Sequence, residues 1–423
     1  MKILFLGINL PNLGTEEGGF YVDLIKELGK KGHQITCIAP SYKRGETGLF
    51  REGFINTLRV AVGDFIGNIP FWKKGINIFL MTWKYIYAYR KWLKKELFDI
   101  ILLPTPPVSL VDVVTYVQKC CGAKLYLILR DIHPECLDRK EIPQWLLERT
   151  DVYEECKKPY GVNPVVYFYL YKKAQKLYSV SKRIGCMSPG NIEYIHQIAP
   201  FTTKEQLVLL PNWYNGNEES IINNILVEGQ IRDKYNLQNK FIAIFGGTIG
   251  EAQAVWNIAQ LAKMNLNKKD VVFLVVGRGV KKEKLQDIAR KDNLSNMLFL
   301  QYMPKNEYEI LLKIADLGLI SIDEKYKVPT CPSKIIGYMA LAKPVLAMFN
   351  RGNDYGEFYI DKSRCGLWSV DLDYITMQKN FEWFYSHPEE RRKMGMSGYH
   401  YYKNHLTVEH VCNLLEEQLL EIQ

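Results

Sequence analysis

Short apolar runs alternate along most of the chain with longer segments in which apolar and polar residues are mixed. In the first half, this pattern predicts a helix from Gly19 to Lys31 and strands at Ile3 to Leu6, Gln34 to Ala39, Ile100 to Leu103, Lys124 to Leu129 and Ile184 to Met187. In the second half, it predicts strands at Phe241 to Phe245, Val271 to Val276, Met297 to Leu300, Leu317 to Ile320 and Pro344 to Ala347. Runs that are apolar throughout are typical of strands buried on both faces, so each half predicts a parallel sheet covered by helices.

The two sets of strands predict an α/β protein with two Rossmann-like, doubly wound domains, which suits a chain of 423 residues. We expect an N-terminal domain over residues 1–215 and a C-terminal domain over 216–400, joined near Pro211 to Asn217. Residues 401–423 are expected to form a helix that packs back on the N-terminal domain. Open α/β sheets bind ligands beyond the carboxyl ends of their strands, so the site is expected in a cleft that the two domains face.

Composition narrows the function further. The net charge of +9 comes without a long basic block, which suits anionic ligands or an anionic membrane surface better than nucleic acid. Nine scattered cysteines without Cys-x-x-Cys spacing indicate a reduced cytosolic compartment rather than disulfides or a zinc site. The opening run Met1 to Gly7 is short and lacks a cleavage site, so it is interpreted as a strand and not as a signal peptide. No span approaches the roughly 20 apolar residues that cross a bilayer.

A glycine-rich turn follows one of the buried strands of the second half. Gly246, Gly247 and Thr248 stand between the run Phe241 to Phe245 and the next predicted helix. Glycines at this place let a ligand approach the main chain closely, as a phosphate does. An ordinary turn would look the same, because the segment lacks the full dinucleotide fingerprint.

A second candidate anion site begins at Ser333. This residue is a good helix N-cap, and Lys334 adds a positive charge beside the positive end of the helix dipole. A capped helix with an exposed lysine is the plainer interpretation. Together with the glycine-rich turn, however, the segment predicts a site for a diphosphate.

The region from Phe54 to Phe98 is unusually rich in aromatic and basic residues. Apolar residues recur at helical spacing at Trp72, Ile76, Phe79, Trp83, Ile86, Leu93 and Leu97. An amphipathic helix in the interface of an anionic membrane is one explanation, with Trp72, Lys73, Lys74, Trp83 and Lys84 in contact with lipid. The alternative is a stripe that faces the core, with a solvated basic face.

Several motifs in this order resemble a known family. They are the glycine loop with Gly18 and Gly19, Gly32-His33-Gln34-Ile35-Thr36, Leu129 to Glu135, Leu210 to Asn215, Gly246 to Gln253, Val276 to Gly279, Ala315-Asp316-Leu317, and Pro332 through Lys334 to Pro344. The chain resembles retaining glycosyltransferases of family 4 with the two-domain GT-B fold. The resemblance is to the bacterial branch of fucosaminyl and related amino-sugar transferases of O-antigen and capsule assembly.

The resemblance implies a hexosyltransferase that uses a nucleotide-diphosphate sugar, usually a UDP-sugar, without a metal or other cofactor. The C-terminal domain would hold the donor, with Gly246, Gly247 and Thr248 under the diphosphate and Lys334 with the amides after Ser333 at the leaving phosphate. Asn212, Gly277 and Arg278 are further donor-side candidates. On the acceptor side, the N-terminal domain offers Gly18, Gly19 and Arg130, although Gly14 to Gly19 also suits a flexible loop.

The resemblance also places an acidic residue, Asp131, where it could orient the acceptor hydroxyl or stabilise positive charge on the sugar. His133 and Glu135 lie beside it as further catalytic candidates. The ordinary pKa of histidine suits proton transfer near neutrality, but a histidine in such a segment is as often a structural hydrogen bonder.

The chain also departs from the family pattern. Where many members carry two glutamates that contact the donor sugar and the ribose, this chain has Pro329 and Gly337, and Glu251 stands where many have a basic residue. The nearby acids Asp323 and Glu324 could substitute for the missing glutamates, but as loop residues before the helix they are expected to be solvated.

We therefore expect a glycosyltransferase on the inner face of the cytoplasmic membrane that extends a lipid-linked saccharide for a bacterial surface polysaccharide. A catalytically silent GT-B subunit that binds a partner transferase or the membrane is the alternative, and a nucleotide-sugar epimerase ranks third.

Overall fold

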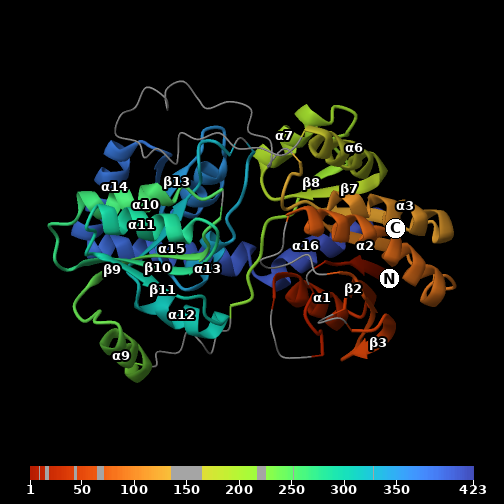
Figure 1. Cartoon of the computed structure of the whole chain (residues 1–423), viewed down its shortest axis with the longest axis horizontal. Coiled ribbons are helices and arrows are strands. Elements are labelled where there is room, and N and C mark those ends of the chain that lie inside the picture. The colour runs from red at the N-terminus through yellow and green to blue at the C-terminus, as the bar shows by residue number, and fades with distance from the viewer. Residues whose placement is uncertain are drawn as a thin grey trace. The chain divides into compact units, whose positions relative to one another are not determined.

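The computed structural model describes the whole chain except residues 9, 15–18, 42–44, 64–70, 135–163, 217–224, 251 and 327. For residues 71–75, 164–165 and 225–226 it describes the backbone alone. The chain forms two compact units (Figure 1). The described residues of the first unit are 1–134, 164–211 and 408–423, and those of the second lie between 212 and 407.

The first unit is built on an eight-stranded sheet in the order β3-β4-β2-β1-β5-β6-β7-β8. Its strands are β1 (Lys2–Leu6), β2 (Gln34–Pro40), β3 (Gly48–Glu52), β4 (Ile55–Val60), β5 (Ile100–Pro104), β6 (Lys124–Ile128), β7 (Ser181–Cys186) and β8 (Leu207–Leu209). All neighbours pair in parallel except β3, which forms an antiparallel hairpin with β4. Strand β5 is buried at every position, as its unbroken apolar sequence predicts.

Helices connect these strands and cover the sheet. They are α1 (Phe20–Lys30), α2 (Phe71–Trp92), η1 (Val108–Leu110), α3 (Val111–Cys121), α6 (Pro164–Val180), α7 (Pro189–Ile198) and α16 (Val408–Leu420). Helix α3 packs against both α2 and α6, and η1 contacts α2 and α6 as well (Figure 1). Because parallel crossovers are right-handed, the connections that run from β1 toward β2 and from β5 toward β8 lie on opposite faces of the sheet.

The C-terminal helix α16 packs against α1 and is tied to the first unit by polar contacts. Gln418 accepts a hydrogen bond from the hydroxyl of Tyr126 at 2.5 Å and donates to the carbonyl of Leu209 at 3.0 Å. Glu416 pairs with Lys31 at 2.9 Å. These bonds satisfy buried polar groups, so they fix the register of the helix on the sheet.

The second unit contains a six-stranded, wholly parallel sheet in the order β11-β10-β9-β12-β13-β14. Its strands are β9 (Phe241–Thr248), β10 (Val271–Arg278), β11 (Met297–Leu300), β12 (Leu317–Ser321), β13 (Val345–Phe349) and β14 (Gly366–Val370). Its helices are α9 (Ile225–Lys234), α10 (Val255–Met264), α11 (Lys282–Lys291), α12 (Lys305–Ile314), α13 (Lys334–Ala340), η3 (Gly356–Asp361), α14 (Tyr374–Ser386) and α15 (Pro388–His405).

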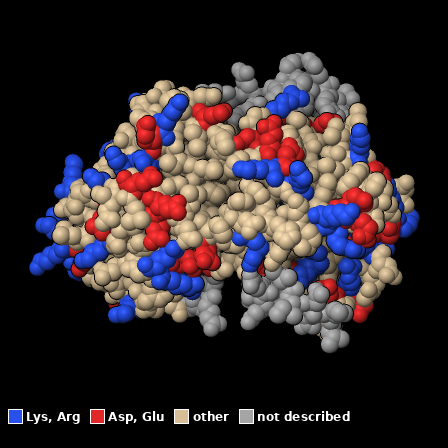
Figure 2. All heavy atoms as spheres, turned by 180° about the vertical axis from the view of Figure 1, so that it is seen from behind, with Lys and Arg blue, Asp and Glu red and all other residues tan. Residues whose placement is uncertain are grey.

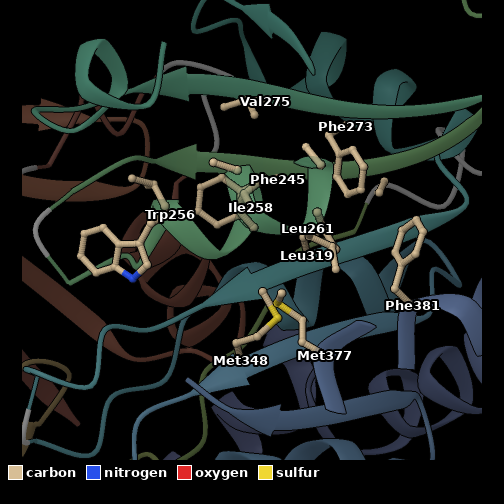
Figure 3. Packing of buried hydrophobic residues seen from close by; sticks show 14 of the residues in the cluster. Phe245, Trp256, Ile258, Leu261, Phe273, Val275, Leu319, Met348, Met377 and Phe381 are labelled. Carbon is tan, nitrogen blue, oxygen red and sulfur yellow. The ribbon is translucent and has the colours of Figure 1, made fainter. Parts of the chain in front are cut away.

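One face of this sheet carries a large apolar core. Phe245 and Phe273 from the strands meet Ile258 and Leu261 of α10 and Phe381 of α14 in one cluster (Figure 3). All five side chains are fully buried. At about 25 cal/mol for each Å² of apolar surface removed from water, such a cluster is a main source of the stability of this unit.

Every strand predicted from the sequence is present, and the prediction of two parallel-sheet α/β domains is confirmed. The pattern missed four strands, namely β3, β4, β8 and β14. Three of them, β3, β8 and β14, lie at the edges of the sheets, where one side of the strand has no neighbour and the sequence need not be apolar throughout.

None of the described helices is long and apolar enough to cross a membrane. The stripe of α2 that could have faced the core does not do so. Ile76, Phe79 and Trp83 are about half exposed or more, while the core side of the helix consists of Met81, Tyr85, Ala88 and Tyr89. The core-facing interpretation of the predicted stripe is therefore wrong for those three residues.

Candidate functional site

The sheet of the second unit reverses its direction of winding between β9 and β12. The chain runs from β9 outward to β10 and β11, whereas from β12 it runs the other way to β13 and β14. A crevice opens at such a point beyond the carboxyl ends of the strands, because the two connections leave on opposite faces. The glycine-rich segment predicted as a turn after the strand is instead the end of β9, because Gly246, Gly247 and Thr248 still pair with β10. This end of β9 and the segment after β12 that contains Lys334 are the two predicted phosphate segments, and they border this point.

Lys334 reaches across from one of these segments to the other. Its Nζ donates a hydrogen bond to Oε1 of Gln253, in the loop after β9, at 3.0 Å. The same ammonium lies 4.0 Å from the ring centroid of Phe245, next to Gly246 in β9. Burial lowers the pKa of Lys334 to about 7. The partly buried amine thus lies beside the glycine-rich segment, and no acidic side chain among the described residues pairs with it to hold its charge.

The helix start at Ser333 differs from the prediction. Ser333 occupies the N-cap position of α13, but its side chain makes no capping hydrogen bond. The amides of Ile335 and Ile336 donate to the carbonyls of Pro332 and Ser333, both at 3.1 Å. A ligand would have to compete with these bonds, so the predicted role of Ser333 and the following amides in holding an anion loses support. The cationic side chain of Lys334 remains.

The glycines of the predicted donor loop serve different purposes. A Cβ on Gly246 would lie 1.9 Å from the hydroxyl of Tyr308, and one on Gly277 would lie 2.0 Å from the carbonyl of Gly247, so close packing requires both glycines. Gly247 has φ of +94°, and a Cβ there would meet nothing within 4 Å. Gly247 is therefore the position where the main chain faces open space, as contact with a ligand requires.

The loops after β9 and β10 are joined by main-chain hydrogen bonds. Ile249 donates to the carbonyl of Arg278 at 3.0 Å and accepts from the amide of Lys281 at 3.1 Å. The side chains of Thr248 and Arg278 are exposed on this rim, and the guanidinium of Arg278 lies 4.5 Å from the ring centroid of Tyr302. The two loops therefore form one rim with a cationic and a hydroxyl group facing solvent.

The loop after β12 is held in place by a cluster of buried acidic residues. The sequence did not predict that these residues are buried. Asp323 and Glu324 are 1% and 4% exposed, so the expectation that they are solvated is wrong. The carboxyl of Asp371, which follows β14, accepts from the amide of Glu324 at 2.7 Å and from Nδ2 of Asn257 at 2.6 Å. Burial and the nearby charge of Asp323 raise the pKa of Asp371 well above its usual range. The cluster holds in place the start of the loop that leads to Lys334.

The remaining donor-side positions lie near the start of the second unit and in α13. Asn212 is buried, and its Oδ1 has no hydrogen-bond partner among the described residues. Gly337 lies inside α13, where a Cβ would be 3.7 Å from the ring of Tyr214, whose hydroxyl donates to Glu309 at 2.5 Å. Glu251 lies outside the described residues. Gly337, which stands where many family members have a glutamate, thus lies close to the hydrogen-bonded pair of Tyr214 and Glu309.

The first unit has its own reversal point, between β1 and β5. The loop after β1 is held by a buried ion pair of the β3–β4 hairpin, which the sequence did not reveal. Arg59 pairs with Glu52 at 2.7 Å and donates to the carbonyls of Leu10 and Pro11 at 2.8 Å and 2.7 Å. Glu52 in turn accepts from the amide of Leu13 at 2.9 Å. The edge hairpin therefore sets the shape of one wall of this crevice.

The predicted catalytic residues follow β6, near this crevice. Burial raises the pKa of Asp131, although the charge of Arg130 lowers it. Burial lowers the pKa of His133 to about 4, so its imidazole is neutral near pH 7. The expectation that His133 has a pKa suited to proton transfer near neutrality is therefore wrong, and the neutral ring is left with hydrogen bonding.

The side chain of Arg130 contacts the main chain of the segment that follows β8. Its guanidinium donates to the carbonyl of Leu210 at 2.9 Å and lies 5.5 Å from the ring centroid of Phe20. Gly19 is the N-cap of α1 with φ of −178°, which any residue adopts, so its backbone does not demand glycine. Gly18 and Glu135 lie outside the described residues, as do the side chains of Trp72, Lys73 and Lys74. Trp83 and Lys84 are exposed.

Among the residues that the structure describes, no group of three or more His, Cys, Asp or Glu side chains could hold a metal ion. The absence of a metal requirement stays a prediction.

Two curated proteins are similar to this chain. The first, "Probable glycosyltransferase WbjE" of Pseudomonas aeruginosa, is 21% identical over 268 residues, which cover 63% of this chain and 61% of the relative. The second, "Putative colanic acid biosynthesis glycosyl transferase WcaI" of Escherichia coli K12, is 21% identical over 362 residues and 81% of each chain. The match thus spans less than two thirds of the length of WbjE.

Solved structures share the fold over the whole chain. A sucrose-phosphate synthase from Thermosynechococcus elongatus has a TM-score of 0.74 at 13% identity and is covered over its full length. Anabaena HepE in complex with UDP has a TM-score of 0.63 at 12% identity, also with full coverage of both chains. Residues 227–401, from α9 into α15, match the sequence profile of the family described as "Glycosyl transferases group 1". The chain therefore has the GT-B fold, and its residues 227–401 match the glycosyl transferases group 1 family.

Proposed function

We propose that this protein is a retaining glycosyltransferase of family 4 that moves a sugar from a UDP-sugar to a lipid-linked saccharide during assembly of a bacterial surface polysaccharide. The observation that carries the proposal is Lys334, whose amine lies between Gln253 and Phe245 at the reversal point of the second sheet. The proposal of a glycosyltransferase for a surface polysaccharide is supported by the names of the relatives, WbjE and the colanic acid transferase WcaI. The UDP that HepE holds supports it as well.

The donor diphosphate would lie against the open main chain at Gly247, with Lys334 at its charged oxygens. Because the pKa of Lys334 is about 7 in the unliganded protein, an arriving diphosphate favours the protonated amine and raises its pKa. The ammonium then offsets the charge that develops on the departing diphosphate. Stabilisation of charge in a site of low dielectric is a large catalytic term and needs no metal here.

In the transfer step, an acceptor hydroxyl forms a bond to the anomeric carbon of the sugar while the bond from that carbon to the diphosphate oxygen breaks. The hydroxyl proton passes to the departing phosphate, because attack comes from the face that the diphosphate leaves, and the configuration is retained. In the first unit, Asp131 would orient the acceptor hydroxyl, and neutral His133 would hold it by a hydrogen bond. The raised pKa of Asp131 suits a group that touches a positively charged sugar only in the transition state.

A lipid-linked acceptor implies work at the inner face of the cytoplasmic membrane, with the protein as a peripheral component. The alternatives are a silent GT-B subunit and a nucleotide-sugar epimerase. Neither has an observation in its favour. Transfer of the sugar to an acceptor with release of UDP separates a transferase from both, because a silent subunit has no turnover and an epimerase returns the sugar still joined to its nucleotide.

The test is a screen of UDP-sugars by thermal shift, followed by measurement of UDP release. A ligand that binds only the folded state raises its melting temperature by mass action. We expect Lys334→Ala to abolish most of the shift caused by UDP and most UDP release. The exposed Lys284→Ala, which removes the same charge from α11, should behave as the parent protein does. An unchanged response to UDP in the Lys334 variant would refute the assignment of the donor site.

A further inference from the structure

The outward side of α2 is apolar, although the helix lies on the surface of the first unit. Ile76, Phe79, Leu80, Trp83 and Tyr87 are 50%, 49%, 42%, 62% and 66% exposed. Their spacing of three or four residues places them on one face of the helix. The opposite face is packed into the unit by Met81, Tyr85, Ala88 and Tyr89. The helix therefore has two apolar faces, and only one of them has a protein partner among the described residues.

Helix α6, which like α2 packs against α3, also carries exposed apolar side chains. Val166, Phe168 and Tyr169 are 39%, 59% and 37% exposed near its start. The amines of Lys172 and Lys173 lie 5.2 Å and 5.4 Å from the ring centroids of Phe168 and Tyr169. Exposed aromatic rings with lysine amines beside them are typical of side chains at the boundary between lipid tails and headgroups, where one end of the side chain is apolar and the other is in water.

The charge of the two helices points to the same partner. Helix α2 carries five Lys or Arg residues and α6 carries three, and neither contains an Asp or Glu. Two of the α6 lysines, Lys173 and Lys176, contact Asp112 of α3. Lys84, Arg90 and Lys91 of α2 and Lys172 of α6 are exposed. On the face of the molecule seen in Figure 2, basic and acidic side chains are interspersed, whereas the sequences of these two helices contain no acid. An anionic surface with an apolar interior complements an acid-free set of cations and rings.

The position of this surface follows from the topology. Helices α2, α3 and α6 each begin at the carboxyl edge of the sheet, because each follows a parallel strand. Four of the five exposed apolar side chains of α2 lie in its first two thirds, and those of α6 lie near its start. The short helix η1, which follows β5, contacts both helices. The hydroxyl of Tyr85, on the inner side of α2, donates to the carbonyl of Gly7, after β1, at 2.8 Å. The apolar surface therefore lies near the crevice between β1 and β5.

We propose that the outward faces of α2 and α6 together form the surface by which this protein enters the interface of an anionic bilayer. This extends the predicted contact of α2 to a second helix. The inserting side chains are the exposed apolar ones, namely Ile76, Phe79, Leu80, Trp83 and Tyr87 of α2 and Val166, Phe168 and Tyr169 of α6. It rests on the proposed function only in one respect, that a lipid-linked acceptor would then leave the bilayer beside the crevice of the first unit.

The experiment is co-sedimentation of the full chain with vesicles of phosphatidylcholine alone and of phosphatidylcholine with an equal part of phosphatidylglycerol. We expect binding to the anionic vesicles that weakens in high salt, since each nearby lysine contributes about fivefold to binding at low salt. Phe79→Ser with Trp83→Ser should weaken this binding by at least about tenfold, and Phe168→Ser should weaken it as well. All three side chains are exposed, so the variants are expected to fold. Ile375→Ser, which removes an apolar side chain that is 84% exposed on α14, is the matched control and should bind as the parent does.

Two outcomes would overturn the proposal. If the Phe79 and Trp83 variant binds as the parent does, the net positive charge alone attracts the vesicles and this surface is not involved. If the parent is a dimer in solution and the same variant is a monomer, the face binds a second copy of the chain instead. Neither donor nor acceptor is present in these measurements, so a failure leaves glycosyl transfer standing. A protein that binds vesicles yet transfers no sugar would refute the proposed function alone.

Discussion

The affinity for UDP should depend on pH through Lys334. The pKa of this amine is lowered to about 7 by burial, from an ordinary value near 10.5. If the diphosphate binds the protonated amine, proton uptake on binding should rise from about half a proton at pH 7 toward one proton at pH 9. The terminal phosphate of UDP has a pKa of about 6, so its own charge is constant from pH 7 to 9 and does not confuse the measurement.

The size of the effect follows from the protonated fraction of the amine. With a pKa of about 7, that fraction is about one half at pH 7 and about one hundredth at pH 9. The dissociation constant for UDP should therefore rise about fifty-fold between these two pH values, because affinity falls with the fraction of protein competent to bind. A lysine with an unperturbed pKa would stay protonated over the whole range and give no such rise.

Isothermal titration calorimetry with UDP at pH 7, 8 and 9 measures both quantities. Repeating each titration in two buffers of different ionisation enthalpy counts the protons taken up, which should approach one for each UDP at pH 9. Lys334→Arg keeps the charge at every pH and should bind UDP with little dependence on pH. An affinity that is the same at pH 7 and pH 9 in the parent protein, with no proton uptake, would refute the reasoning that links the buried amine to the diphosphate.

Three further predictions concern stability, and urea denaturation at pH 7, repeated toward pH 4 for the Arg59 variant, checks each of them. Gly337→Ala should stabilise the protein by about 0.5–1 kcal/mol, because the new methyl group has room beside Tyr214 and the helix interior favours alanine; a loss of stability would contradict this placement. Arg59→Met should destabilise it by about 3–5 kcal/mol by leaving Glu52 buried without its partner, and the deficit should shrink toward pH 4 as Glu52 becomes protonated. Gln418→Leu should cost about 1–3 kcal/mol, because the hydroxyl of Tyr126 loses its acceptor, and a neutral effect would show that α16 is held by apolar packing alone.

The low pKa of the Glu52 carboxyl gives the sign of that pH dependence. Burial raises this pKa, but hydrogen bonds from Arg59 and from the amide of Leu13 lower it by more. The ion pair therefore stabilises the parent protein above the pKa of an unfolded glutamate, and this contribution is lost as the pH falls through the lower folded value.

Several parts of the site could be predicted from sequence because they depend on local features. Lys334 and Gly247 each lie between a buried apolar strand and a predicted helix. A glycine or a cation in such a place can be recognised from the sequence alone. Other parts could not be predicted. Asp323 and Glu324 look like solvated loop acids until Asp371, far along the chain, is seen to accept a hydrogen bond from the amide of Glu324. The pair of Glu52 and Arg59 lies in two strands that the pattern missed, one of them at the exposed edge of the sheet.

The same division holds for helix α2. Its sequence shows apolar residues at helical spacing, but the spacing does not say which of two apolar faces has a partner. Only the packing of Tyr85 and Tyr89 against the unit leaves Phe79 and Trp83 on the outside.

The residues alone predict two sets of buried strands, two parallel sheets, and the two candidate phosphate segments, one with glycines at the end of β9 and one with Lys334 after β12. The burial of a strand can be predicted from its own sequence, because a strand that is covered by apolar neighbours on both faces is itself apolar at nearly every position. The order β11-β10-β9-β12-β13-β14 is decided by contacts between residues far apart in the chain, and no local pattern encodes them. That order brings Gln253 within 3.0 Å of Lys334, and so the tertiary structure alone turns two separate segments into one candidate site.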